Sequence, residues 1–189
     1  MALIDFFHEI GGLKDLKRTG WLMRKVSNPE SVADHSFRTA IFALILAPRL
    51  KLNTEKCLKM ALLHDIAEVR IGDIPGRAKE EDQVVRDKHK QAMEKKAMQQ
   101  LMAEIDDEKQ SDELFTLWLE LEESITPEAK FVKQLDKLEL AFQTYEYEKA
   151  GRNGMSLEEF YHYCDRYLHD PELKKIFEEI KSKRKWLNA

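Results

Sequence analysis

Apolar residues recur every three or four positions along most of the chain, which is the spacing of amphipathic helices. No segment keeps up an alternation of apolar and polar residues, so we expect no sheet. The pattern therefore predicts an all-α protein, a bundle of helices in a single domain. The predicted helices cover 2–10, Ser31 to near Pro48, Asn53 or Thr54 through Asp65, 78–104, 111–124, Pro127 to Asn153-Gly154, 156–168 and 171–186, with a less regular stretch over 13–30.

Two of these helices have unusual polarity. Ser31 followed by Asp34 resembles a capping box, and the helix that begins there is apolar on most sides, so we expect it to be buried. In the next helix the apolar residues Cys57, Ala61 and Leu62 occupy the turns before its end, where the ionisable residues His64, Asp65 and Glu68 follow one another closely. Three ionisable groups at the end of an apolar helix need compensation by a partner or an ion.

Length and composition set limits on function. The 189 residues suit one domain over 1–189, with 35% charged and 43% hydrophobic residues. The formal net charge of −4 gives no overall positive field for a nucleic acid polymer or an anionic membrane. Cys57 and Cys164 form no CxxC pattern and suggest reduced thiols in a cytoplasmic protein. The first residues carry acids within a short apolar run, which is typical of neither a signal peptide nor a membrane span.

Four residues stand out as candidate ligands of a metal ion: His35, His64, Asp65 and Asp136. His35 lies in the first turn of a mostly apolar helix and Asp136 lies at the rim of an apolar stripe, where an unpaired imidazole or carboxylate would be costly. Two imidazoles and two carboxylates suit a divalent metal ion that keeps water among its ligands. Each residue also has an ordinary explanation, such as a hydrogen-bonded core histidine or a capping aspartate. The residues by themselves leave a shared metal and separate structural roles equally open.

Longer strings resemble a known family. The order His35, His64-Asp65 and Asp136 is similar to the signature of the HD-domain superfamily of metal-dependent phosphohydrolases. The local strings resemble its 5′-deoxynucleotidase (YfbR-like) branch over roughly residues 3–170. These strings are Arg18-Thr19-Gly20-Trp21, Pro29-Glu30-Ser31-Val32-Ala33-Asp34-His35, and His64-Asp65-Ile66-Ala67-Glu68 through Gly72-Asp73-Ile74-Pro75.

The resemblance implies an HD-type helical bundle that hydrolyses deoxyribonucleoside 5′-monophosphates to deoxyribonucleosides and phosphate. It implies one divalent metal ion, with Co²⁺ or Mn²⁺ favoured and Mg²⁺, Zn²⁺ or Fe²⁺ compatible. The core of the metal site would span about 30–145, followed by C-terminal helices over about 156–186, and the protein would be a homodimer. The implied metal ligands are His35, His64, Asp65 and Asp136, with Glu68 and Asp73 as catalytic acids or bases and Arg18 on the phosphate.

The sugar side departs from the family pattern. Bacterial members carry an aromatic residue directly after the arginine, whereas Thr19-Gly20 precede Trp21 here. Trp21 is a candidate substrate-binding residue that stacks on a base or sugar, and it is equally a candidate core residue. Arg24, Arg77 and Lys137 are weaker candidates for the phosphate pocket.

Two alternatives remain from the sequence. The first is another HD-type phosphohydrolase that cleaves a triphosphate, a cyclic nucleotide or a signalling nucleotide. The second is a helical protein that binds a metal or nucleotide without turnover and uses the charged helix over 78–104 to contact a partner or a second subunit. Separate detection of phosphate, pyrophosphate and triphosphate would distinguish these activities.

Overall fold

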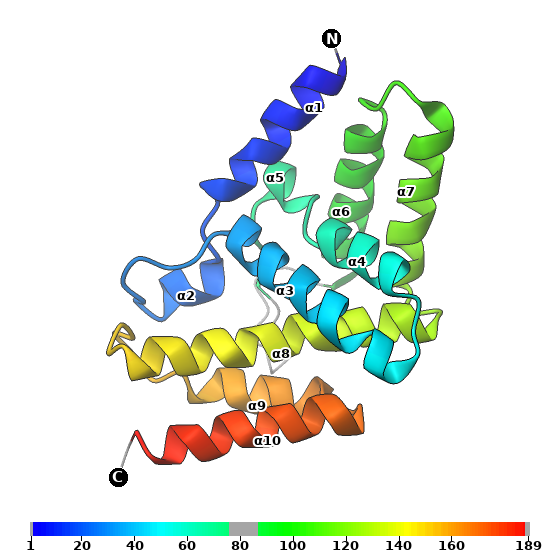
Figure 1. The fold of residues 1–189 in the computed structure, drawn as a ribbon. Helices are drawn as coiled ribbons and strands as arrows, with labels where there is room; N and C mark the ends of the chain where they lie inside the picture. The colour runs from blue at the N-terminus through cyan, green and yellow to red at the C-terminus, as the bar shows by residue number, and fades with distance from the viewer. Residues whose placement is uncertain (1, 76–86, 188–189) are drawn as a thin grey trace.

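The protein is built from helices that pack in layers (Figure 1). The computed structural model describes residues 2–75 and 87–187. Within these residues no strand occurs, and Lys17 and Ser31 form only an isolated antiparallel bridge. The all-α prediction is therefore confirmed. The elements are α1 Ala2–Gly11, η1 Gly12–Lys14, α2 Thr19–Met23, α3 Val32–Leu46, η2 Pro48–Leu50, α4 Thr54–Leu63, α5 Glu68–Ile71, α6 Asp87–Met102, α7 Glu108–Glu122, α8 Pro127–Lys149, α9 Glu158–Tyr167 and α10 Pro171–Lys185.

The long helix α8 is the centre of the packing. It contacts α3, α4 and α7 as well as α9 and α10, and Figure 1 shows α9 and α10 lying along it on the side away from α3. Because both sides of α8 are covered, its buried residues include Leu135, Leu138 and Ala141. One hydrophobic core runs from Trp21 to Ile180 and so includes the C-terminal helices. Asp136 thus projects from a helix whose position is determined on two sides.

The predicted helix starts agree with the caps. Ser31 accepts a hydrogen bond from the Asp34 N–H, and the Asp34 carboxylate accepts one from the Ser31 N–H, so the capping box is present. Thr126 caps α8 with Pro127 in its first turn. These caps satisfy N–H groups that have no partner within the helix, and they place the first turn of α3 beside the centre of α8.

Burial of α3 is less complete than the sequence predicted. Phe37, Ile41, Leu44 and Ile45 are each 40–66% exposed, so the expectation of a fully buried helix is wrong. Its opposite face packs on α4 and α8, where Ala43 has no exposed surface. Apolar residues on most sides of a helix do not ensure that neighbours cover every side. None of the described helices is both long and apolar enough to cross a membrane.

The helix predicted to run through Asp65 ends earlier. After Leu63 the chain tightens, since the Ile66 N–H donates to Leu63 O (3.3 Å) and the Glu68 N–H to Asp65 O (3.1 Å). The Ala61 carbonyl, which a continuing helix would give to the Asp65 N–H, accepts His64 Nδ1 at 2.8 Å. Because the helix ends at Leu63, the side chains of the adjacent residues His64 and Asp65 can approach the same point. The predicted helix over 78–104 is observed from Asp87 to Met102, and Arg77, Val84 and Val85 lie outside the described residues.

Candidate metal and phosphate site

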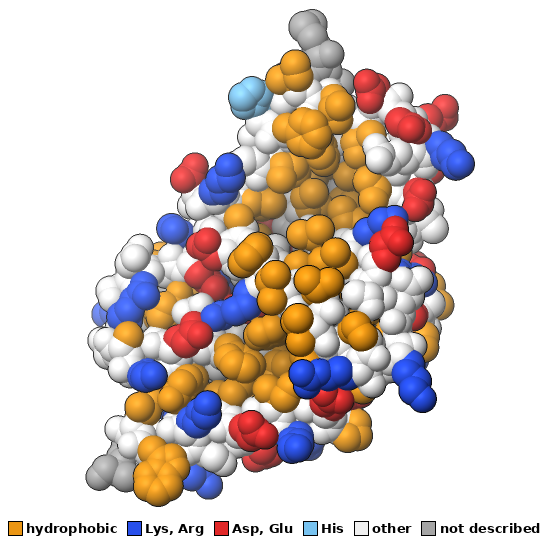
Figure 2. Space-filling view, in the orientation of Figure 1, with side chains coloured by type: hydrophobic (Ala, Val, Ile, Leu, Met, Phe, Trp, Pro, Cys, Tyr) orange, Lys and Arg blue, Asp and Glu red, His pale blue; other side chains and the backbone are white. Residues whose placement is uncertain are grey.

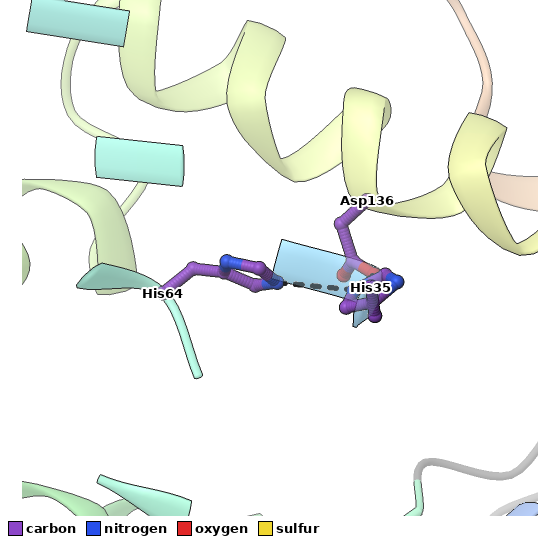
Figure 3. Close-up of side chains that lie close together, drawn as sticks. All are labelled: His35, His64 and Asp136. Carbon is purple, nitrogen blue, oxygen red and sulfur yellow. Dashed lines mark hydrogen bonds and ion pairs between the residues drawn. The ribbon is translucent and has the colours of Figure 1, made fainter. Parts of the chain in front are cut away.

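Side chains from three helices converge at the middle of α8 (Figure 3). His35 comes from the first turn of α3, His64 from the end of α4 and Asp136 from α8. His35 Nε2 lies 3.1 Å from His64 Nε2 and 3.2 Å from Asp136 Oδ1. One ligand atom from each residue lies within 4.8 Å of the others, which is close enough to share an ion.

Asp65 joins this group from the turn after α4. Its Oδ2 lies 3.2 Å from His64 Nε2 and 3.7 Å from His35 Nε2. The same oxygen accepts a hydrogen bond from Arg18 Nη1 at 2.8 Å. The structure therefore brings together the four residues that the sequence singled out as metal ligands.

Hydrogen bonds on the far side of each imidazole determine where its lone pair points. His64 Nδ1 bonds the Ala61 carbonyl, which can only accept, so His64 Nδ1 carries the proton. His35 Nδ1 lies 2.5 Å from Glu139 Oε2, a carboxylate that is fully buried. A carboxylate behind a histidine is a common way to orient a metal ligand. The Nε2 atoms of His35 and His64 are then both directed at the point where these histidines meet Asp136.

The nitrogen and oxygen atoms gathered there suit a cation at that point. Two Nε2 atoms at 3.1 Å cannot both present a lone pair to each other without positive charge between them. Burial and Arg18 lower the pKa of His35, but Glu139 and Asp136 outweigh them and raise it to about 10. A proton on His35 satisfies one neighbour, whereas a divalent ion can accept nitrogen and oxygen lone pairs from all four residues. These residues fit one divalent metal ion.

A second set of potential ligands lies on the other side of His35. Glu30, His35 and Glu139 also offer atoms within 4.8 Å of one another. Both carboxylates already have protein partners, because Glu139 Oε1 accepts Arg38 Nε at 2.8 Å and Glu30 Oε1 accepts Trp21 Nε1 at 2.8 Å. We therefore assign Glu30 and Glu139 the role of holding His35 in place. Glu139 was missed in the sequence, although it follows Asp136 by three residues on the same helix.

Arg18 is held over the metal site by the loop that follows α5. Gly72 ends α5 with φ of 78°, a conformation that favours glycine, and turns the chain toward α2. Asp73 Oδ2 then accepts the Thr19 N–H, and the Thr19 hydroxyl donates to Asp73 O at 2.8 Å. Asp73 Oδ1 lies 4.0 Å from Arg18 Nη1. Thr19, which the sequence did not single out, thus fastens this loop beside the predicted phosphate ligand.

Glu68 has an oxygen that none of the described residues bonds. Its side chain lies in the first turn of α5 and is only 4% exposed. Oε2 is buried and has no hydrogen-bond partner within the described part of the chain. Burial, followed by the charges of Asp65 and Asp73, raises the pKa of Glu68 well above its ordinary value. A buried carboxyl oxygen of this kind calls for a ligand or water to complete it.

A cavity of about 150 Å³ lies between these groups and α9. One part of its wall is polar and includes Arg18, Asp65, Glu68, Asp73 and Asp136. The other part is mostly apolar, with aromatic rings from α9. That part includes Trp21, Ile74, Pro75, Leu140, Phe160 and Tyr163.

Trp21 contributes to the cavity wall mainly as a core residue. It is 1% exposed, and its ring centroid lies 5.1 Å from that of Tyr147 and 4.5 Å from that of Phe160. Its Nε1 donates to Glu30. The half-buried aromatic rings of the cavity belong instead to Phe160 and Tyr163, three residues apart on α9. Their spacing was the available sequence signal for one shared helix face.

The weaker phosphate candidates have other partners. Arg24 Nε donates to Glu159 Oε1 at 2.6 Å, which ties α2 to α9 at the edge of the cavity. Lys137 Nζ lies 2.6 Å from Asp136 Oδ2 and 5.2 Å from the centroid of the Tyr163 ring. Lys137 and Lys90 both line the cavity, so they extend the positive charge beside the metal ligands.

Comparison with known proteins identifies the family to which this chain belongs. A 5′-deoxynucleotidase HDDC2 from Xenopus laevis is 38% identical over 183 residues, covering 97% of this chain and 88% of that protein. The 5′-deoxynucleotidase hdd1 of Schizosaccharomyces pombe is 35% identical over 188 residues, covering 97% and 91%. The solved structure of PH0347 from Pyrococcus horikoshii is 35% identical, has a TM-score of 0.75 and covers 97% and 99% of the two chains. The family model described as HD domain matches residues 10–177, and the chain belongs to the HD-domain family.

Proposed function

We propose that the protein is a metal-dependent 5′-deoxynucleotidase that converts deoxyribonucleoside 5′-monophosphates to deoxyribonucleosides and phosphate. One observation carries the proposal: two histidine Nε2 atoms and two aspartates converge beside Arg18 and the unpartnered oxygen of Glu68. A metal site, a phosphate ligand and an acid or base are the groups that phosphomonoester hydrolysis needs. The relatives that carry the name 5′-deoxynucleotidase cover nearly the whole chain and support the substrate class.

His35, His64, Asp65 and Asp136 would hold one divalent metal ion, with Co²⁺ or Mn²⁺ favoured. Mixed imidazole and carboxylate ligands accept either ion, as well as Zn²⁺, Fe²⁺ or Mg²⁺. When bound, such an ion polarises a phosphate oxygen and lowers the pKa of water.

The remaining site residues would bind the phosphate, orient the water and transfer the proton. Arg18 would bind phosphate oxygens, because its planar guanidinium offers several donors while Asp65 and Asp73 contact only its Nη1. Glu68 would orient the attacking water or carry a proton, since its Oε2 has no protein partner among the described residues. Asp73 is already engaged by Thr19, so its proposed role is to position Arg18 and the leaving O5′.

The nucleoside would extend along the aromatic part of the cavity. Phe160 and Tyr163 offer ring surface for a base or a deoxyribose, and Trp21 supports Phe160 from the core. Stacking on an aromatic ring tolerates every base, because each base has a π face. This arrangement favours a hydrolase that acts on several deoxynucleotides.

The activity is tested by removing and restoring the metal. Protein stripped of metal should release no phosphate from dAMP, dGMP, dCMP, TMP or dUMP, and Co²⁺ or Mn²⁺ should restore release. Asp136→Asn should abolish it with an unchanged helical signal, whereas Asp165→Asn on the exposed face of α9 should retain it. No release from any of the five substrates would reject the proposed function. Pyrophosphate or triphosphate released from a deoxynucleoside triphosphate would support the alternative phosphohydrolase.

We also propose a homodimer formed through α3. Phe37, Ile41, Leu44 and Ile45 recur on one side of the helix and are exposed. In Figure 2 hydrophobic side chains form a band down this face of the molecule. Exposed apolar patches of this kind mark interaction sites, and a two-fold axis would place α3 against its own copy. Ile45→Asp should yield a monomer in sedimentation, and an unchanged oligomeric state would reject this interface.

A cytoplasmic location is proposed as well. Cys57 and Cys164 are free and buried, which suits a compartment that keeps thiols reduced. Fractionation of cells would test the location, and recovery outside the cytoplasm would contradict it.

A further inference from the structure

A second cavity reaches the metal ligands from another direction. It measures about 210 Å³ and lies between α6, α7 and α8. The two cavities meet α8 on either side of Asp136, since the first touches Leu140 and the second touches Val132 and Lys133. Asp65 and Asp136 line both cavities. Two of the proposed metal ligands therefore border both spaces.

The walls of the two cavities differ in chemistry. Beside its polar groups, the first has aromatic and aliphatic residues from α2, α9 and the loop after α5. The second has mainly charged or polar walls, with no Phe, Tyr or Trp among the described residues that line it. Glu94, Glu122 and Lys133 line only this cavity, whereas Lys90 and Lys137 line both. A nucleoside suits the first space and a small hydrated anion suits the second.

We propose that the second cavity is a phosphate passage, through which inorganic phosphate leaves the metal site and water reaches it without passing the nucleoside. The inference rests on the proposed function. In hydrolysis the water oxygen bonds to phosphorus while the P–O5′ bond breaks, and the proton that water loses is balanced by the one that O5′ gains. The attacking and leaving oxygens lie roughly in line across phosphorus. With the nucleoside in the aromatic cavity, the second cavity offers water and phosphate a route to Asp65 and Asp136 that the nucleoside does not occupy.

The charges in the passage suit weak binding of an anion. Lys133 Nζ lies 2.6 Å from Glu122 Oε1, and Lys90 Nζ lies 3.4 Å from Glu94 Oε1. Each lysine is thus held in place by a carboxylate that partly offsets its charge. Phosphate would meet lysines along the passage without being bound tightly, because the paired carboxylate offsets part of each lysine's attraction for an anion.

Two substitutions that change the charge in opposite directions test the passage. Lys133→Gln removes a cation and should weaken binding of inorganic phosphate about three- to fivefold, whereas Glu122→Gln frees Lys133 and should strengthen it by a similar factor. Lys130→Gln removes the same charge from an exposed position one turn earlier on α8 and should change nothing. Titration calorimetry of phosphate into the metal-loaded protein measures all three, and thymidine affinity should stay constant.

A rate measurement tests the separate route. Binding of phosphate to the Co²⁺-loaded protein can be followed by the Co²⁺ absorption in a stopped-flow instrument, with and without saturating thymidine. The passage predicts the same association rate in both cases. A rate limited by thymidine dissociation, or equal phosphate affinities for Lys133→Gln and Glu122→Gln, would overturn the passage. Wild-type protein that hydrolyses deoxynucleotides while failing these tests would reject the passage and leave the proposed function in place.

Discussion

Glu139 offers the sharpest test of how the metal ligands are oriented. Its carboxylate has no exposed surface, lies 2.5 Å from His35 Nδ1 and bonds Arg38 Nη2 at 2.6 Å. Glu139→Gln keeps the shape but removes the charge that directs His35 Nε2 toward the other ligands. Loss of such a partner typically weakens metal binding about 10–100-fold. That range corresponds to roughly 1.4–2.7 kcal/mol of binding free energy.

The assay is competition for Co²⁺ or Mn²⁺ between the metal-free protein and a coloured chelator. Glu146→Gln is the matched control, because Glu146 bonds Arg38 Nη1 at 2.7 Å but does not touch His35. The unfolding free energy of Glu139→Gln should also fall, by roughly 1–3 kcal/mol, so circular dichroism must show that the variant is folded under the assay conditions. Wild-type affinity in Glu139→Gln, or an equal loss in Glu146→Gln, would refute the reasoning.

Three further predictions concern other parts of the site and core. Arg18→Lys should lower kcat/KM for deoxynucleotides about 10-fold or more, because a lysine cannot bond two phosphate oxygens in one plane; unchanged kinetics would remove Arg18 from the phosphate. Trp21→Phe should lower the unfolding free energy in urea by roughly 1–3 kcal/mol, because Glu30 loses its donor; a loss of activity without a loss of stability would favour substrate stacking instead. Burial raises the pKa of the Cys57 thiol to about 12 and also raises the pKa of the Cys164 thiol. Because the thiolate is the form that reacts with iodoacetamide, neither cysteine should be alkylated at about pH 8 in the folded protein. Rapid alkylation of either cysteine before unfolding would contradict this burial.

Short sequence patterns predicted much of the fold. The caps at Ser31 and Thr126 are encoded within a few residues, and the structure begins α3 and α8 where they predict. The tightened turn after Leu63 was not predicted, because it depends on a side chain, His64, that takes a backbone carbonyl. The exposed side of α3 was also missed, since periodicity reveals an apolar face but not which element covers it.

Site residues were predictable where an ionisable residue lies among apolar neighbours in the sequence. His35 lies on a mostly apolar helix and Asp136 lies at the rim of an apolar stripe, and this contrast singled them out. Glu139 gave no such signal, because a glutamate on a long, charged helix reads as a surface residue until the packing of α3 places Arg38 and His35 against it. The aromatic side of the cavity depends on α9 packing on α8 and on Phe160 meeting Trp21, which is distant from it in the sequence. Short-range patterns could not locate Phe160 and Tyr163 there.

The central claim is that one divalent metal ion is shared by His35, His64, Asp65 and Asp136. Anomalous diffraction from Co²⁺-loaded crystals, recorded at the cobalt absorption edge, locates the ion directly. We predict one peak in each chain, about 2.0–2.2 Å from both Nε2 atoms and from one oxygen of each aspartate. A peak between Glu30 and Glu139, or no peak at His35 and His64, would contradict the claim.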